Sequence, residues 1–119
     1  MKTYIGIDPG DKGYITVIKG QDVDFLSIAE NDYHNVALFL KNTATLAEDG
    51  CVCCMESIHA VSGSSAKATF SFGETFGVLQ GLLIALGIPY HLVPPKIWQK
   101  EMWITEDKVY KSKDGKRSV

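Results

Sequence analysis

Two acidic residues, Asp8 and Glu56, each end a short apolar run that is typical of a buried strand. If those strands are parallel neighbours in one sheet, their carboxyl ends meet at the same edge and both carboxylates lie in one crevice. Two like charges in a partly dry site repel each other unless a cation neutralises them. A few carboxylate oxygens, completed by water or phosphate oxygens, usually hold Mg²⁺. Such a site supports metal-assisted phosphodiester hydrolysis.

The same residues also have a simpler interpretation. Asp8 precedes Pro9-Gly10, and an Asp in this position commonly starts a turn by accepting hydrogen bonds from the backbone that follows it. Glu56 can equally be the first residue of a loop. Spacing alone leaves the metal site and the turn-starting roles both open.

The rest of the sequence predicts the elements that would position these acids. Alternating turn residues and β-branched or aromatic runs indicate strands, and apolar residues at helical spacing indicate two helices. Parallel neighbours need a helical crossover, so the order of elements predicts an α/β fold with a mixed five-stranded sheet: an antiparallel meander of three strands followed by two parallel strands, with helices on both faces. The expected strands are residues 3–8, 14–18, 22–28, 52–56 and 90–93, and the expected helices are residues 33–46 and 70–86.

Length and composition fit one globular domain over residues 1–119. Hydrophobic residues make up 45% of the chain and charged residues 22%, which is ordinary for such a domain. We find no apolar run of membrane-spanning length and no signal-peptide pattern, and therefore expect a cytoplasmic protein without a membrane partner. The three cysteines crowd into residues 51–54, too few and too close for a disulfide framework or a zinc site, so we expect buried thiols in a strand.

Charge is distributed unevenly along the chain. Up to Pro95 there are five Lys against ten Asp and Glu, whereas from Lys96 onward six Lys and one Arg face four acids. A basic tail on an acidic body is compatible with nucleic-acid binding and with a merely solvated terminus. The net charge of −2 does not separate the two.

Small residues recur at every fourth position of the second expected helix. Each Gly in a helix interior costs about 1 kcal/mol relative to Ala, so a close-packed neighbour is needed to explain three of them. That neighbour is either the sheet below or the same helix of a second copy. The stripe consists of Gly73, Gly77, Gly81 and Ala85.

Several of these segments together resemble the RuvC-type Holliday junction resolvases, especially their phage-like branch, in the ribonuclease H-like superfamily. The resemblance rests on YIGIDPGDKG at residues 4–13, on Glu56 at the end of the fourth strand, on the Gly-punctuated helix, and on VPPKIWQK at residues 93–100. It implies a crossover junction endodeoxyribonuclease that requires Mg²⁺, with Mn²⁺ as a substitute, and acts as a homodimer on four-way DNA. Asp8 and Glu56 would then be the catalytic metal ligands, and the glycine stripe the dimer interface.

Basic and aromatic residues near the same edge are the candidate DNA contacts, because phosphates supply much of the affinity and unstacked bases sit on rings. The alternative is that the lysines only solvate loops and the aromatic residue belongs to the core. The candidates are Lys12, His59, Lys67, Phe70, Lys96 and Lys100.

One departure from the family pattern concerns two further carboxylates, which the family carries on a helix after the VPPKxW segment. Here Asp107 and Asp114 lie in a Lys-rich stretch without apolar periodicity. We therefore expect residues 1–119 to be a C-terminally incomplete domain. The alternative function is a non-catalytic DNA-binding or regulatory protein of the same fold.

Overall fold

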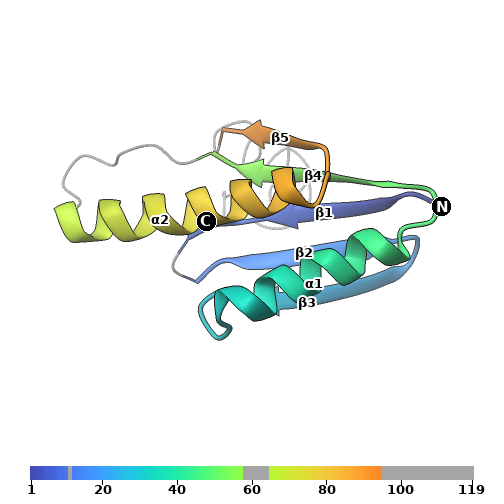
Figure 1. Cartoon of the computed structure of the whole chain (residues 1–119), viewed down its shortest axis with the longest axis horizontal. Coiled ribbons are helices and arrows are strands. Elements are labelled where there is room, and N and C mark those ends of the chain that lie inside the picture. The colour runs from blue at the N-terminus through green and yellow to red at the C-terminus, as the bar shows by residue number, and fades with distance from the viewer. Residues whose placement is uncertain (11, 58–64, 95–119) are drawn as a thin grey trace, which may run out of the picture.

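The computed structural model describes residues 1–10, 12–57 and 65–94 of the chain. Five strands and two helices alternate in the predicted order (Figure 1). The strands are β1 (Thr3–Ile7), β2 (Tyr14–Lys19), β3 (Asp22–Ser27), β4 (Cys51–Glu56) and β5 (Tyr90–Val93), and the helices are α1 (Tyr33–Leu46) and α2 (Ala66–Ala85).

The strands form one mixed sheet in the order β3-β2-β1-β4-β5. β1 pairs antiparallel with β2 and β2 with β3, whereas β4 lies parallel to β1 on one side and to β5 on the other. The predicted meander and the two parallel strands are confirmed. Four strand bounds differ by one residue from the prediction: β1 ends at Ile7, β2 at Lys19 and β3 at Ser27, and β4 begins at Cys51.

The hydrophobic core lies between one face of the sheet and the two helices. Along β1 the buried and exposed residues alternate, as expected when only one face of a strand is covered. The buried sheet residues Ile5, Ile15 and Met55 pack in one cluster with Leu40 of α1 and Leu79 of α2. Both described helices therefore cover the same face, as Figure 1 shows. The prediction of helices on both faces is therefore not met by the described part of the chain, in which α1 and α2 leave the other face without a helix.

The opposite face of the sheet, which we call the open face, carries no described helix. Its exposed apolar side chains come from three adjacent strands, and the strand registers place them on one side. These side chains are Tyr4, Tyr14, Ile18, Val23 and Phe25.

The cysteine prediction is correct for only one of the three thiols. Cys53 is fully buried on the helix face, where burial and the neighbouring thiols raise its pKa to about 12. Cys51 is partly buried, and Cys54 is exposed because alternation along β4 turns it to the open face.

Side-chain caps fix where both helices begin. Asp32 caps α1 by accepting a hydrogen bond from the Asn35 backbone N–H at 2.8 Å. Ser65 caps α2 in the same way through the Ala68 N–H at 3.0 Å, so this helix begins four residues before the predicted start. Consequently Lys67, which was expected in a loop, lies in the first turn of α2.

By length and composition alone, α2 could cross a membrane. This corrects the expectation that the chain has no apolar run of membrane-spanning length. Two of its leucines, Leu79 and Leu83, are nevertheless fully buried in the domain core. The other sides of the helix are largely open: Phe70 is 72% exposed and Ile84 67% exposed. The described residues therefore cover only one side of α2.

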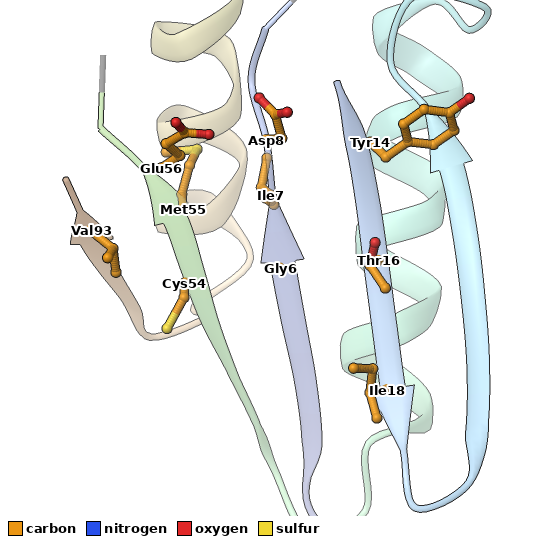
Figure 2. A pocket seen from close by; sticks show the side chains of 10 residues that line it. All are labelled: Gly6, Ile7, Asp8, Tyr14, Thr16, Ile18, Cys54, Met55, Glu56 and Val93. Atoms are coloured by element: carbon orange, nitrogen blue, oxygen red, sulfur yellow. The ribbon is translucent and has the colours of Figure 1, made fainter. Parts of the chain in front are cut away.

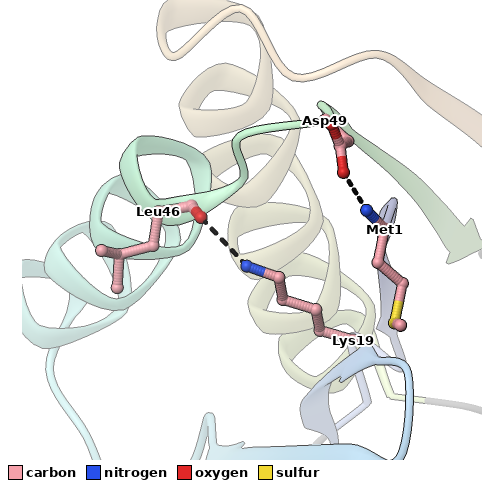
Figure 3. A network of polar contacts seen from close by, with 4 residues as sticks. All are labelled: Met1, Lys19, Leu46 and Asp49. Atoms are coloured by element: carbon pink, nitrogen blue, oxygen red, sulfur yellow. Dashed lines mark hydrogen bonds and ion pairs between the residues drawn. The ribbon is translucent and has the colours of Figure 1, made fainter.

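Polar contacts link the chain at the end of the sheet where β1 begins. The N-terminal ammonium of Met1 pairs with Asp49, and Lys19 donates to the Leu46 carbonyl in the last turn of α1 at 3.4 Å (Figure 3). A lysine in this position satisfies a helix-end carbonyl. Because the ion pair is exposed, it contributes little to stability.

Candidate functional site

The parallel register of β1 and β4 brings Asp8 and Glu56 to the same edge of the sheet. Ile7 of β1 lies opposite Met55 of β4, and each acid is the next residue of its chain segment. Figure 2 shows both carboxyl groups at the same end of these neighbouring strands. The sequence-based inference that the two acids share one edge is confirmed.

A hollow of about 410 Å³ extends from this edge along the open face. Gly6 contributes to its floor: a Cβ at this position would meet no atom within 4 Å, so the glycine leaves open space above β1. The walls are mainly apolar or uncharged, and the two acids stand at one end. Residues that line the hollow are Gly6, Ile7, Asp8, Tyr14, Thr16, Ile18, Cys54, Met55, Glu56 and Val93.

Asp8 takes part in the turn that follows β1. Its Oδ1 accepts a hydrogen bond from the Gly10 N–H at 3.0 Å, and its own N–H donates to the Tyr14 carbonyl at 3.0 Å. The interpretation of Asp8 as a turn-starting residue is therefore correct, and it does not exclude a role of Asp8 as a metal ligand. Among the described residues Oδ2 accepts no hydrogen bond, so one oxygen orients the carboxylate while the other stays available.

The two carboxylates influence each other electrostatically. Partial burial, and secondly the negative charge of Asp8, raise the pKa of Glu56 above its ordinary value. This unfavourable charge pair is the situation that a divalent cation relieves. Within the described ranges no group of three or more His, Cys, Asp or Glu residues is placed to hold a metal. Two carboxylates with water and phosphate oxygens are nevertheless a sufficient ligand set for Mg²⁺.

Replacing Glu56 by Gln should raise the melting temperature at neutral pH when no divalent cation is present. A folded-state pKa above the unfolded value means that Glu56 binds its proton more tightly in the folded protein than in the unfolded chain. The protonated carboxyl group therefore adds stability at acid pH, and this contribution is lost as the pH rises through the folded pKa. Gln removes that loss, and we expect a rise of a few degrees at pH 7 that disappears below the ordinary pKa of Glu.

Calorimetry of both proteins from pH 4 to 8, with a chelator present, measures this difference. A melting temperature that is lower for the Gln variant at every pH would show that Glu56 stabilises the fold and would contradict the charge-repulsion argument.

No family model and no curated protein matches this chain. A structure of T. thermophilus RuvC in complex with Holliday junction substrate matches with a TM-score of 0.59 at 10% sequence identity, over 81% of this chain and 66% of that chain. The chain has the ribonuclease H-like fold of RuvC. A second Thermus thermophilus RuvC structure matches with a TM-score of 0.44 at 14% identity, over 78% of this chain and 64% of that chain.

The chain spans slightly less than two thirds of the RuvC chains that it matches, 66% and 64% of their lengths. The predicted fold class is thus confirmed as RuvC-like. The phage-like branch stays a prediction, because neither match bears on it.

The candidate DNA contacts fall into two groups. Lys12 is exposed in the turn between β1 and β2, which leaves the sheet at the edge that carries Asp8. Lys67 and Phe70 lie in the first turns of α2, which projects beyond that edge in Figure 1. The core alternative is wrong for Phe70, whose side chain is 72% exposed. His59, Lys96 and Lys100 lie outside the described residues.

The predicted glycine stripe is solvent-facing in the RuvC-like domain. Gly73, Gly77, Gly81 and Ala85 are all exposed, and a Cβ at any of the three glycines would meet nothing within 4 Å. The sheet is therefore not the close-packed neighbour of this stripe, and packing against a second copy stays a prediction.

Sequence reasoning missed the residues that line the hollow beside the acids, such as Tyr14, Thr16 and Cys54. A usable signal was present, because residues two apart on a strand share a face. Counting two residues back from Asp8 and from Glu56 places Gly6 and Cys54 on one face with the acids.

Proposed function

We propose that this chain belongs to a divalent-metal-dependent endonuclease that cuts branched DNA, such as a four-way junction. The observation that carries the proposal is the pair Asp8 and Glu56 at the shared end of β1 and β4, with the Glu56 pKa raised by its surroundings. The RuvC-like fold supports it, since the matched T. thermophilus RuvC structure is a complex with a Holliday junction.

Asp8 and Glu56 would hold the metal, Mg²⁺ or Mn²⁺ in its place. When bound, such an ion neutralises phosphate charge and makes a water molecule a better nucleophile. The chain's own contribution is orientation: the Gly10 N–H fixes Oδ1 of Asp8, and the β1–β4 register fixes the spacing of the two strand ends. Lys12, Lys67 and Phe70 supply charge and a ring for DNA near the same edge.

A non-catalytic DNA-binding protein of the same fold is the second candidate. It is favoured by one observation, that the described residues bring only two carboxylates together and no third ligand. Both candidates predict junction binding, and they differ in cleavage.

The deciding experiment measures binding and cleavage of a synthetic four-way junction and of a linear duplex, each with Mg²⁺ and with a chelator. We expect preferential binding of the junction and Mg²⁺-dependent nicks in it. Junction binding without cleavage in Mg²⁺ or Mn²⁺ would favour the binding protein, whereas equal affinity for both DNAs would remove branched DNA from the proposal.

A homodimer formed through the glycine stripe is part of the proposal. Gly77→Leu places a large side chain where the two helices would approach, and we expect the dimer to dissociate at least about tenfold more readily. Ala68→Leu is the matched control, because Ala68 is also exposed on α2 but lies off the stripe. Sedimentation at several micromolar concentrations measures both, and a wild-type chain that is monomeric throughout would remove the dimer.

A further inference from the structure

Helix α2 reaches the turn that follows β1, and the proposed function makes no use of this contact. Gly10 lies in that turn, and its N–H donates the hydrogen bond to Oδ1 of Asp8 at 3.0 Å. The Phe72 ring of α2 lies beside the same glycine, with its Cζ atom 4.0 Å from the position that a Cβ of Gly10 would occupy. Gly10 is therefore a close neighbour of both the carboxylate and an aromatic ring.

We propose that Phe72 is a positioning residue for the metal site. Its ring restricts the movement of Gly10, and Gly10 in turn holds the Asp8 carboxylate in the orientation that binds a divalent cation. The inference rests on the proposed function, because it concerns the same acid and the same cation. Phe72 itself is not a catalytic residue, since its side chain has no polar atom with which to bind a metal or a phosphate.

The position of Phe72 on α2 explains why its ring points at the turn. Phe76, Leu79 and Leu83 follow it by four, seven and eleven residues, which places all four side chains on one side of the helix. Leu79 and Leu83 are fully buried in the core, and Phe76 packs against that core. Phe72 is half-buried and stands one turn before them, where its neighbour is the turn after β1.

A second contact fixes this part of α2 to the domain. The hydroxyl groups of Tyr33 and Thr75 lie within hydrogen-bonding distance of each other, at 3.2 Å, and join α2 to the first turn of α1. Thr75 is three residues from Phe72, so both side chains lie on neighbouring parts of the same helix face. The helix is thus anchored close to the point where the ring meets the turn.

The expected size of the effect follows from how Asp8 is held. Among the described residues, the Gly10 N–H is the single hydrogen-bond donor to the Asp8 carboxylate. Groups that orient metal ligands from behind typically change metal affinity by about 10- to 100-fold when they are lost. The Asp8 backbone has a separate support, its hydrogen bond to the Tyr14 carbonyl, so loss of the ring should loosen the side chain without moving β1.

Mn²⁺ binding in the absence of DNA tests the proposal. Electron paramagnetic resonance measures the free ion, and the binding that is lost in Asp8→Asn defines the site. Phe72→Ala should weaken this binding at least about tenfold. Phe72→Met keeps an apolar, flexible side chain of similar reach and should stay within about threefold of the wild type.

Phe76→Ala is the matched control, because it is the same change one turn along the same helix face. It removes a ring that packs against the core, so it should lower the melting temperature more than Phe72→Ala does. Mn²⁺ binding by the folded chain should nevertheless stay within about twofold of the wild type. Phe76→Leu serves the same purpose if the Ala variant does not fold.

The junction assay gives a second measurement of the same effect. Phe72→Ala should raise the Mg²⁺ concentration needed for half-maximal cleavage at least about tenfold. Its junction affinity in a chelator should equal that of the wild type, because the ring contacts the turn and not the DNA.

Each contrary outcome has a distinct meaning. Equal Mn²⁺ binding by the wild-type chain and by Phe72→Ala would overturn the role of Phe72 and leave the proposed metal site in place. A loss of affinity as large in the Phe76 control would show that metal binding only follows stability, and would also contradict the inference. No difference between the wild type and Asp8→Asn would remove the metal site itself, and with it both the proposed function and the inference.

Discussion

Asp8→Asn should abolish Mg²⁺-dependent nicking of a four-way junction, with a loss of roughly a thousandfold or more, the scale on which a group needed in the transition state is felt. The reason is that Asn offers a neutral oxygen where the site needs a charged one. The fold should not change, because an Asn Oδ1 can accept the same hydrogen bond from the Gly10 N–H. Single-turnover cleavage with enzyme in excess over junction measures the effect.

Asp24→Asn is the matched control for this substitution. Asp24 also accepts a backbone hydrogen bond, from the Phe25 N–H at 2.9 Å, but it lies in the middle of β3 and is not among the residues that line the hollow. Its replacement should leave cleavage within about twofold of the wild type. Undiminished cleavage by the Asp8 variant, with junction binding intact, would remove Asp8 from the metal site and with it the main support for a nuclease.

Binding separates a damaged site from a damaged fold. Replacement of Asp8 or of Glu56 by its amide removes a negative charge close to where phosphate would lie, so junction affinity in a chelator should be equal or higher. A variant that loses both binding and cleavage would point to misfolding, and its circular dichroism and melting temperature would show this directly.

How far the sequence predicts this site depends on which physical rule is strong locally. α1 was predicted to the residue, because Asp32 caps it and its apolar residues recur at helical spacing. The convergence of Asp8 and Glu56 followed from the meander and the helical connection after it. β3 runs in the same direction as β1, α1 joins β3 to β4, and the parallel strands β1 and β4 then end at one edge.

Other features could not be read from the sequence, for identifiable reasons. β4 is apolar at nearly every position, which indicates a strand covered on both faces, and nothing in residues 51–55 tells which side is left open. Cys54 was therefore misplaced as buried. The start of α2 was missed because the Ser- and Gly-rich residues before Ser65 obscure which serine is the cap.

The turn after β1 should depend on Gly13 more than on any other glycine. We expect Gly13→Ala to lower the free energy of unfolding by about 2–4 kcal/mol, the range of severe backbone or steric substitutions. A Cβ at this position would overlap the carbonyl oxygen of Asp8 and would come within 2.9 Å of the Gly10 oxygen. Both are backbone atoms, so no side-chain rotation can relieve the overlap.

Hydrogen bonds hold that backbone in place from several sides. The Gly13 N–H donates to the Gly10 carbonyl at 2.9 Å, and the Ile28 N–H donates to the Gly13 carbonyl at 3.0 Å. Relief of the overlap must therefore break contacts between β1, β2 and the end of β3, or else displace Asp8. The substitution tests whether the position of the acid and the stability of the sheet are set by the same turn.

Urea unfolding followed by circular dichroism measures the loss, with Gly73→Ala as the control. Gly73 is exposed on α2 with no atom within 4 Å of the added Cβ, so Ala should stabilise the helix by up to about 1 kcal/mol. The two identical substitutions thus have opposite expected signs. If Gly13→Ala leaves the unfolding midpoint unchanged, the turn can open without cost, and Asp8 is then held by the β1–β4 register alone.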